Sequence, residues 1–234
     1  MATKPAQHTS FPPSRQSTIH RFLNQYTERH TGLVKYFKLV PEFERLSMSD
    51  KIRLIRNSFC FTLPINEATL SHGLSQQLID SIPLLFDGNV AAPLIRCIQL
   101  VHSYATDRSL LKILLVIKNL STGIYRYRHD AAMDSIYDDT LAIFAAQNIY
   151  VELLWRYLLR RFPTEFDAVK FFNKLIQDLI FVQTISFTAD CHINNSAHEI
   201  EQMDPLIQSM WPAPNQSNSS DTDECDMSES TSSL

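Results

Sequence analysis

The densest group of residues that could bind a metal ion is Asp190-Cys191-His192, with His198 further along the chain. Carboxylate, thiol and imidazole groups are the usual zinc ligands, but their spacing here matches no recognised zinc pattern. The four cysteines of the chain include no Cys-x-x-Cys pair, so they begin neither a zinc module nor a redox motif. We therefore expect an ordinary loop at residues 190–192, no bound metal or other cofactor, and reduced thiols.

Two adjacent acids, Asp138 and Asp139, are the most obvious pair of carboxylates for acid–base catalysis. Neighbouring residues on a helix point about 100° apart, so the two groups would not face a common substrate. We interpret them as solvated surface acids. The chain also lacks a nucleophile elbow, a phosphate-binding loop and a dinucleotide fingerprint, and we predict that it is not an enzyme.

The segment Leu111-Lys112-Ile113-Leu114-Leu115 has the Leu-x-x-Leu-Leu spacing by which short helices bind apolar grooves. The same spacing occurs in any helix that buries one side. Because this segment lies within a longer apolar stretch, we interpret its leucines as core residues.

The composition predicts an all-helical protein. Only 4 of 234 residues are glycine, which leaves little material for tight hairpins, while 44% are hydrophobic. Apolar residues at three- and four-residue spacing predict helices, two of which end at a proline. The expected helices are 17–40 ending before Pro41, 49–63 ending at Pro64, a short one at 74–82 within an irregular segment 62–90, then 91–104, 107–124, 136–162, 164–187 and 204–212. The helix at 136–162 is apolar on most sides, so we expect it to lie inside a layered bundle.

Three regions are expected along the chain: a disordered arm at 1–16, a helical domain at 17–211 and an acidic Ser/Thr-rich disordered tail at 212–234. The tail contains five acids and no Lys or Arg. No basic surface suited to nucleic acid is apparent, and no stretch of about 18 apolar residues could cross a membrane.

Residues 37–56 (FKLVPEFERLSMSDKIRLIR) resemble the signature of nuclear receptor ligand-binding domains. Seven residues fit that signature without a gap: Lys38, Pro41, Phe43, Leu46, Asp50, Leu54 and Arg56. Residues 150–158 and 205–211 are similar to the late helices and the terminal activation helix of the same family. The resemblance implies a three-layer antiparallel helical sandwich.

The resemblance also implies a groove for a coregulator helix, with a cation from the third helix at one rim and an acid from the terminal helix at the other. Such rims suit the opposite partial charges at the two ends of a bound helix. Lys38 matches the cation, and Ser209 stands where the family has glutamate. The other expected groove residues are Val34, Ile52, Ile55, Arg56, Leu206, Ile207 and Met210. Losing the acid costs about 0.3 to 1 kcal/mol, so we expect weak coactivator binding and a relative preference for corepressor-like helices.

The family often binds acidic lipids through an arginine late in the fifth helix. Here no Lys or Arg occurs between Arg56 and Arg96. We therefore expect any ligand to be small, neutral and apolar, held by Phe59, Phe61 and Ile113, unless side chains fill the cavity.

The zinc DNA-binding domain of the family uses eight cysteines, and this chain has four. The resemblance thus implies a transcriptional regulator in the nucleus, with the cytoplasm left open, that acts through coactivator or corepressor helices without contacting DNA. Residues 164–187 match the family's dimer face, which implies a homodimer or a heterodimer with a retinoid-X-type receptor. The alternative is an all-helical protein-interaction scaffold with no ligand, whose similarity to the signature is accidental.

Overall fold

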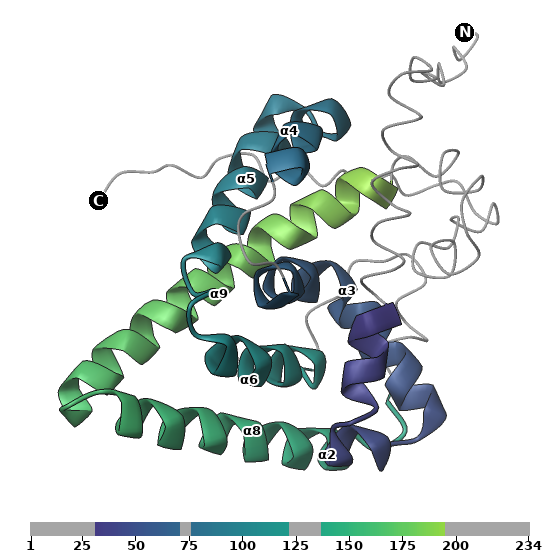
Figure 1. Ribbon diagram of the computed structural model, residues 1–234. Coiled ribbons are helices and arrows are strands. Elements are labelled where there is room, and N and C mark those ends of the chain that lie inside the picture. The colour runs from purple at the N-terminus through teal and green to yellow at the C-terminus, as the bar shows by residue number, and fades with distance from the viewer. Residues whose placement is uncertain (1–30, 71–75, 122–136, 195–234) are drawn as a thin grey trace, which may run out of the picture.

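The computed structural model describes residues 31–70, 76–121 and 137–194. Within these ranges the secondary structure is helical and no strand occurs, which confirms the all-α prediction for this part of the chain (Figure 1). The expected arm, the expected tail and the expected helix at 204–212 lie outside the described residues.

Residues 31–37 are helical, and seven further helices follow in the described ranges. They are α2 (Pro41–Glu44), α3 (Met48–Leu70), α4 (Gln76–Leu85), α5 (Gly88–His102), α6 (Arg108–Asn119), α8 (Thr140–Arg161) and α9 (Glu165–Asn194).

Side-chain caps fix where four of these helices begin. Asp87, Asp107 and Asp139 each accept backbone N–H bonds from the first turn of α5, α6 and α8, and Thr164 does the same for α9. Each such cap contributes about 1 kcal/mol to helix stability. The predicted helices of the second half therefore start within a few residues of where the structure has them.

Two expectations about prolines are wrong. Pro64 does not end its helix, because α3 continues to Leu70, and the described residues between 62 and 90 are mostly helical rather than irregular. An internal proline costs about 3 kcal/mol, yet Pro64 is buried and the turns around it bury Phe61, Ile65 and Ala68, which offsets that cost. The expected short helix at 74–82 corresponds to α4.

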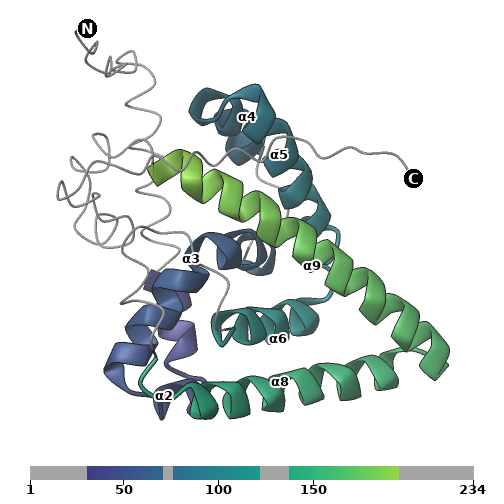
Figure 2. The ribbon, with the colours of Figure 1, turned by 180° about the vertical axis from the view of Figure 1, so that it is seen from behind.

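The centre of the described structure is α3, which contacts α5, α6 and α9. The helices α8 and α9 form two arms of a V with α6 and α3 between them (Figure 1), and from behind α9 crosses α3 and α5 (Figure 2). Leu111, Leu114 and Leu115 of α6 are all buried, which confirms that the Leu-x-x-Leu-Leu segment packs in the core.

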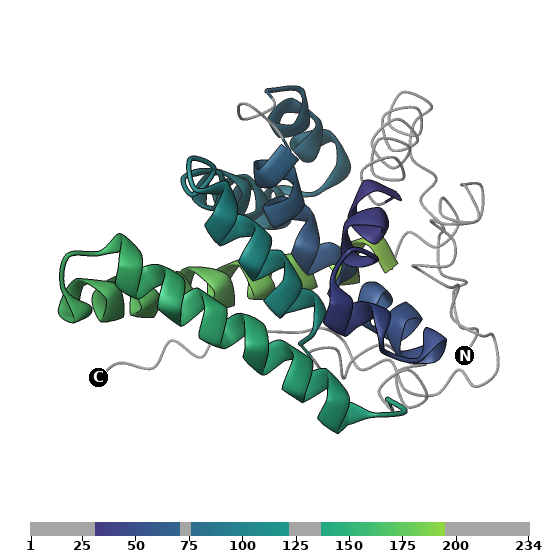
Figure 3. The same ribbon diagram turned by 60° about the horizontal axis from the view of Figure 1, so that its bottom comes forward.

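The expectation that α8 lies inside the bundle is wrong. Figure 3 shows α8 along the outer edge of the described helices. One side packs on α6 and α9, while Leu141, Phe144 and Leu159 on its other side are exposed. The sequence pattern could not separate these cases, because an apolar surface stripe and a buried face have the same periodicity.

Candidate functional site

The signature segment forms one corner of the main hydrophobic core. Phe37, Phe43, Leu46 and Leu54 are buried there, and the rings of Phe37 and Phe43 lie 5.7 Å apart between centroids. Pro41 is the first residue of α2, where its missing N–H costs no hydrogen bond. Proline therefore begins a helix here as well as ending the one before it.

The expected groove residues that the structure describes lie on the helix at 31–37, directly after it, and on α3. Lys38 follows directly on the helix at 31–37 and is exposed, while Val34, one turn earlier, is half-buried. On α3, Ile52 is 46% exposed and Ile55 packs against the core cluster that contains Leu33 and Phe37. Arg56 is half-buried. Leu206, Ile207, Ser209 and Met210 lie outside the described residues, so the opposite rim is not described.

Two exposed apolar residues near this surface were missed by the sequence analysis. Leu39 follows Lys38 and is 79% exposed, and Met48, one turn before Ile52 on α3, is 69% exposed. Met48 and Ile52 are four residues apart, so they share one side of the helix. That spacing was visible in the sequence and could have added Met48 to the groove.

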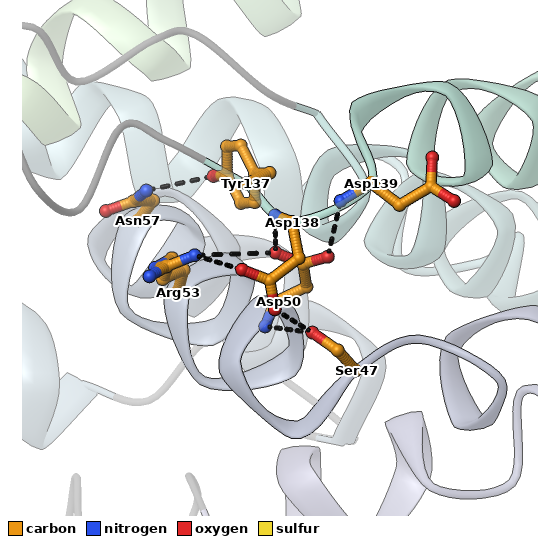
Figure 4. Close-up of polar contacts among 7 residues, drawn as sticks. All are labelled: Ser47, Asp50, Arg53, Asn57, Tyr137, Asp138 and Asp139. Carbon is orange, nitrogen blue, oxygen red and sulfur yellow. Dashed lines mark hydrogen bonds and ion pairs between the residues drawn. The ribbon is translucent and has the colours of Figure 1, made fainter.

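The signature aspartate, Asp50, is fully buried and holds the start of α8 to the start of α3 (Figure 4). Its Oδ1 accepts a 2.7 Å hydrogen bond from the Asp138 N–H, and its Oδ2 accepts one of 3.2 Å from the Asp139 N–H. A buried carboxylate is tolerated only when its oxygens find such donors. The sequence signature thus marks a residue that connects two distant segments.

Asp138 and Asp139 are exposed, which confirms that they are surface acids, but Asp138 also has two side-chain partners. Its carboxylate accepts a 2.7 Å hydrogen bond from Ser47 Oγ and lies 3.1 Å from Arg53 Nη1, as Figure 4 shows. The Ser47 hydrogen bond, followed by Arg53, holds the pKa of Asp138 below its usual value. Asp139 caps α8, so the two acids have different structural roles. Local sequence did not indicate the partners of Asp138, because both lie more than eighty residues away along the chain.

The residues expected to line a ligand pocket do not gather in one place. Phe61 is buried in the main core, whereas Ile113 packs against a second cluster around Leu110, Leu154 and Leu158. The side chain of Phe59 lies outside the described part of the structure.

Lys118 of α6 brings a positive charge against Phe61, a contact that no local sequence pattern predicts. Its Nζ lies 4.1 Å from the centroid of the Phe61 ring and donates a 3.1 Å hydrogen bond to Gln183 Oε1 of α9. Burial lowers the pKa of Lys118 to about 8. The packing of α6 on α3 therefore supplies a cation beside Phe61.

The expected loop at residues 190–192 is also wrong, since α9 continues to Asn194. Asp190 is buried, and the His192 ring lies 5.3 Å from that of Phe86. Among the described residues no three His, Cys, Asp or Glu side chains are grouped so that they could hold a metal ion. His198 lies outside these residues.

No known protein-family model matches the chain, and no curated protein is significantly similar to it. None of the helices in the described ranges has the length and apolar character needed to cross a membrane.

Proposed function

We propose that the chain is a nuclear receptor-like transcriptional regulator module that binds coregulator helices in a surface groove. It acts in the nucleus through partners, by binding rather than by catalysis. The implied architecture is the three-layer helical sandwich of that family, and the arrangement of α3, α6 and α9 around a common core is compatible with it.

One observation carries this proposal: the signature residues divide by position into a buried set and an outward set. Phe43, Leu46 and Leu54 support the core, while Lys38 is exposed, as is Ile52 within the same segment. In this proposal Lys38 binds the free carbonyls at the end of a docked helix, and Met48 and Ile52 contact its apolar side.

Binding of a fluorescent Leu-x-x-Leu-Leu peptide, measured by polarisation, tests the proposal. Removing a charged donor from helix-end carbonyls costs about 1.5 to 3 kcal/mol, so Lys38→Ala should weaken binding roughly tenfold or more. Lys35→Ala is the matched control, because Lys35 is exposed on the same helix and lies outside the signature. Equal peptide binding by both variants would instead favour the all-helical scaffold.

A second face supports the proposed self-association. Exposed apolar residues follow one side of α8 and one side of α9, and the edge-to-face contact of Trp155 with Phe172, 6.0 Å between centroids, joins the two helices. The exposed residues are Leu141, Phe144, Val151, Leu159, Phe166, Val169, Ile176 and Ile180.

The size of this face suits a dimer. With about 200 Å² for each fully exposed large side chain, these eight side chains together offer on the order of 800 Å² of apolar surface along the two helices. That equals what one partner buries in a standard interface. We propose a homodimer through α8 and α9, with a heterodimer with a retinoid-X-type receptor as the alternative.

A further inference from the structure

Residues 31–56 carry an excess of positive charge. They contain six basic and three acidic residues, whereas all other residues before 215 contain 15 basic and 17 acidic ones. The three acids have partners of their own. Glu42 accepts a hydrogen bond from the Tyr150 hydroxyl, Glu44 lies 3.4 Å from Lys51 Nζ, and Asp50 accepts the backbone N–H bonds described above. The acids of the segment therefore leave part of its positive charge unmatched.

The unmatched cations are Lys35, Lys38 and Arg45. All three are exposed, and among the described residues no carboxylate forms an ion pair with any of them. Lys35 and Lys38 are three positions apart at the end of one helix, so their side chains are neighbours. Arg45 directly follows α2, which packs on that helix through the rings of Phe37 and Phe43 (Figure 1). One corner of the fold thus presents three cations.

Residues 221–229 have the complementary chemistry. They contain five carboxylates and no Lys or Arg, and as an extended strand they span about 30 Å. The end of α9 at Asn194 is 27 positions before Asp221, a stretch that reaches at most about 90 Å. A domain of 200 residues has a radius of gyration of about 17 Å, so this acidic segment can reach any face of the fold.

We propose that the acidic segment 221–229 binds the corner formed by Lys35, Lys38 and Arg45 of its own chain. Single surface ion pairs contribute little, but several carboxylates joined covalently to the same molecule act at a high effective concentration. The bound segment covers Lys38 and competes with a coregulator helix for it. The contact between segment and corner stands without the proposed function, and only the competition rests on it.

Crosslinking of the full chain with a water-soluble carbodiimide, which joins carboxylates to neighbouring amines, tests the contact. Mass spectrometry should find residues 221–229 linked to Lys35 and Lys38 at least about fivefold more often than to Lys112 and Lys170, exposed lysines of α6 and α9. The preference should be present at about 20 mM salt and lost at about 500 mM, where the Debye length falls from about 20 Å to about 4 Å.

Arg45→Glu keeps both reporter lysines and should reduce their crosslinks severalfold. Arg160→Glu is the matched control, because Arg160 is an exposed arginine of α8 away from the corner, and it should leave the crosslinks unchanged. Circular dichroism establishes that both variants are folded. Equal crosslinking of all four lysines, or no effect of Arg45→Glu, would overturn the proposal. So would links that join an isotope-labelled chain to an unlabelled one, since they would place the segment on a second copy.

The competition is measured with the fluorescent Leu-x-x-Leu-Leu peptide. A chain whose five carboxylates are replaced by amides should bind the peptide about threefold more tightly than the natural chain at about 20 mM salt, and equally at about 500 mM. The five substitutions are Asp221→Asn, Asp223→Asn, Glu224→Gln, Asp226→Asn and Glu229→Gln. The expected crosslinks together with a peptide that binds neither chain would contradict the coregulator groove and support the contact. Equal peptide affinity at both salt concentrations would contradict the competition.

Discussion

Asp50 accepts backbone hydrogen bonds from Asp138 and Asp139 while its own side chain is fully buried. The first turn of α3 and the first turn of α8 are thereby joined through one carboxylate. Removing it would leave two backbone N–H groups without partners and a cavity beside Arg53.

Asp50→Ala should lower the free energy of unfolding by about 2 to 4 kcal/mol, because charged hydrogen bonds are lost and their donors stay buried. Denaturant unfolding measures this change. Asp80→Ala is the control, since Asp80 is exposed and accepts a hydrogen bond from Gln76 within its own helix. A similar small loss in both variants would contradict the role of Asp50.

The stability of the protein should rise as the pH increases from 8 to 10. The pKa of Lys118 is lowered from 10.5 to about 8 in the folded state, so the unfolded chain binds more protons across this interval. The gain reaches at most about 3 kcal/mol and is absent below pH 8, where both states are protonated. Chemical unfolding at several pH values measures it.

Lys118→Met should flatten this pH profile and raise stability at pH 7, since an apolar chain replaces an unpaired ammonium. Above about pH 9 both chains share an opposite slope, because burial raises the pKa of the Cys97 thiol to about 12, and burial followed by hydrogen bonding raises the pKa of Tyr104 and Tyr150. The difference between the two profiles therefore isolates Lys118, and identical profiles between pH 8 and 10 would show that Lys118 is well solvated.

Ser209→Glu should strengthen binding of a Leu-x-x-Leu-Leu peptide about twofold to fivefold. The substitution restores the acid that the family places opposite Lys38, and a carboxylate at a helix N-terminus contributes about 0.3 to 1 kcal/mol more than a neutral group. Peptide titration followed by fluorescence polarisation would detect it. Unchanged peptide affinity would contradict the prediction that residue 209 lies at the rim of the groove.

Ile180→Lys should shift the protein towards the monomer in sedimentation velocity. Ile180 is 59% exposed within the apolar face of α8 and α9, and a charge there would be buried on dimerisation. Leu84→Lys is the control, because Leu84 is an exposed apolar residue of α4, away from this face. A monomeric natural chain at all concentrations would contradict the homodimer.

Most of the helical order was predictable from local signals. Asp107, Asp139 and Thr164 cap helices whose starts the sequence placed within a few residues. Pro64 predicted a helix end that does not occur, because the cost of a proline is local, whereas the burial of Phe61 and Ile65 that offsets it depends on distant helices.

The candidate site likewise combines features that local sequence predicts with features that depend on contacts between distant segments. Lys38 and Ile52 are exposed, and their role in a groove stays a prediction, whereas the placement of Lys118 against Phe61 results from packing between α3 and α6. The contacts of Asp138 with Ser47 and Arg53 likewise join segments remote in sequence. Periodicity identifies the side of a helix that is apolar, and it does not identify the neighbour that covers it.

The bond between Asp50 and Asp138 spans 88 positions of the chain. At a synthesis rate of about 5 to 20 residues per second, Asp138 leaves the ribosome roughly 4 to 18 seconds after Asp50. Throughout that interval the Asp50 carboxylate lacks the N–H donors of Asp138 and Asp139 that accompany its burial. The start of α3 therefore reaches its folded state only after the start of α8 has been synthesised. A chain that stops short of residue 138 would leave the Asp50 carboxylate and the core beside it accessible to chaperones and proteases.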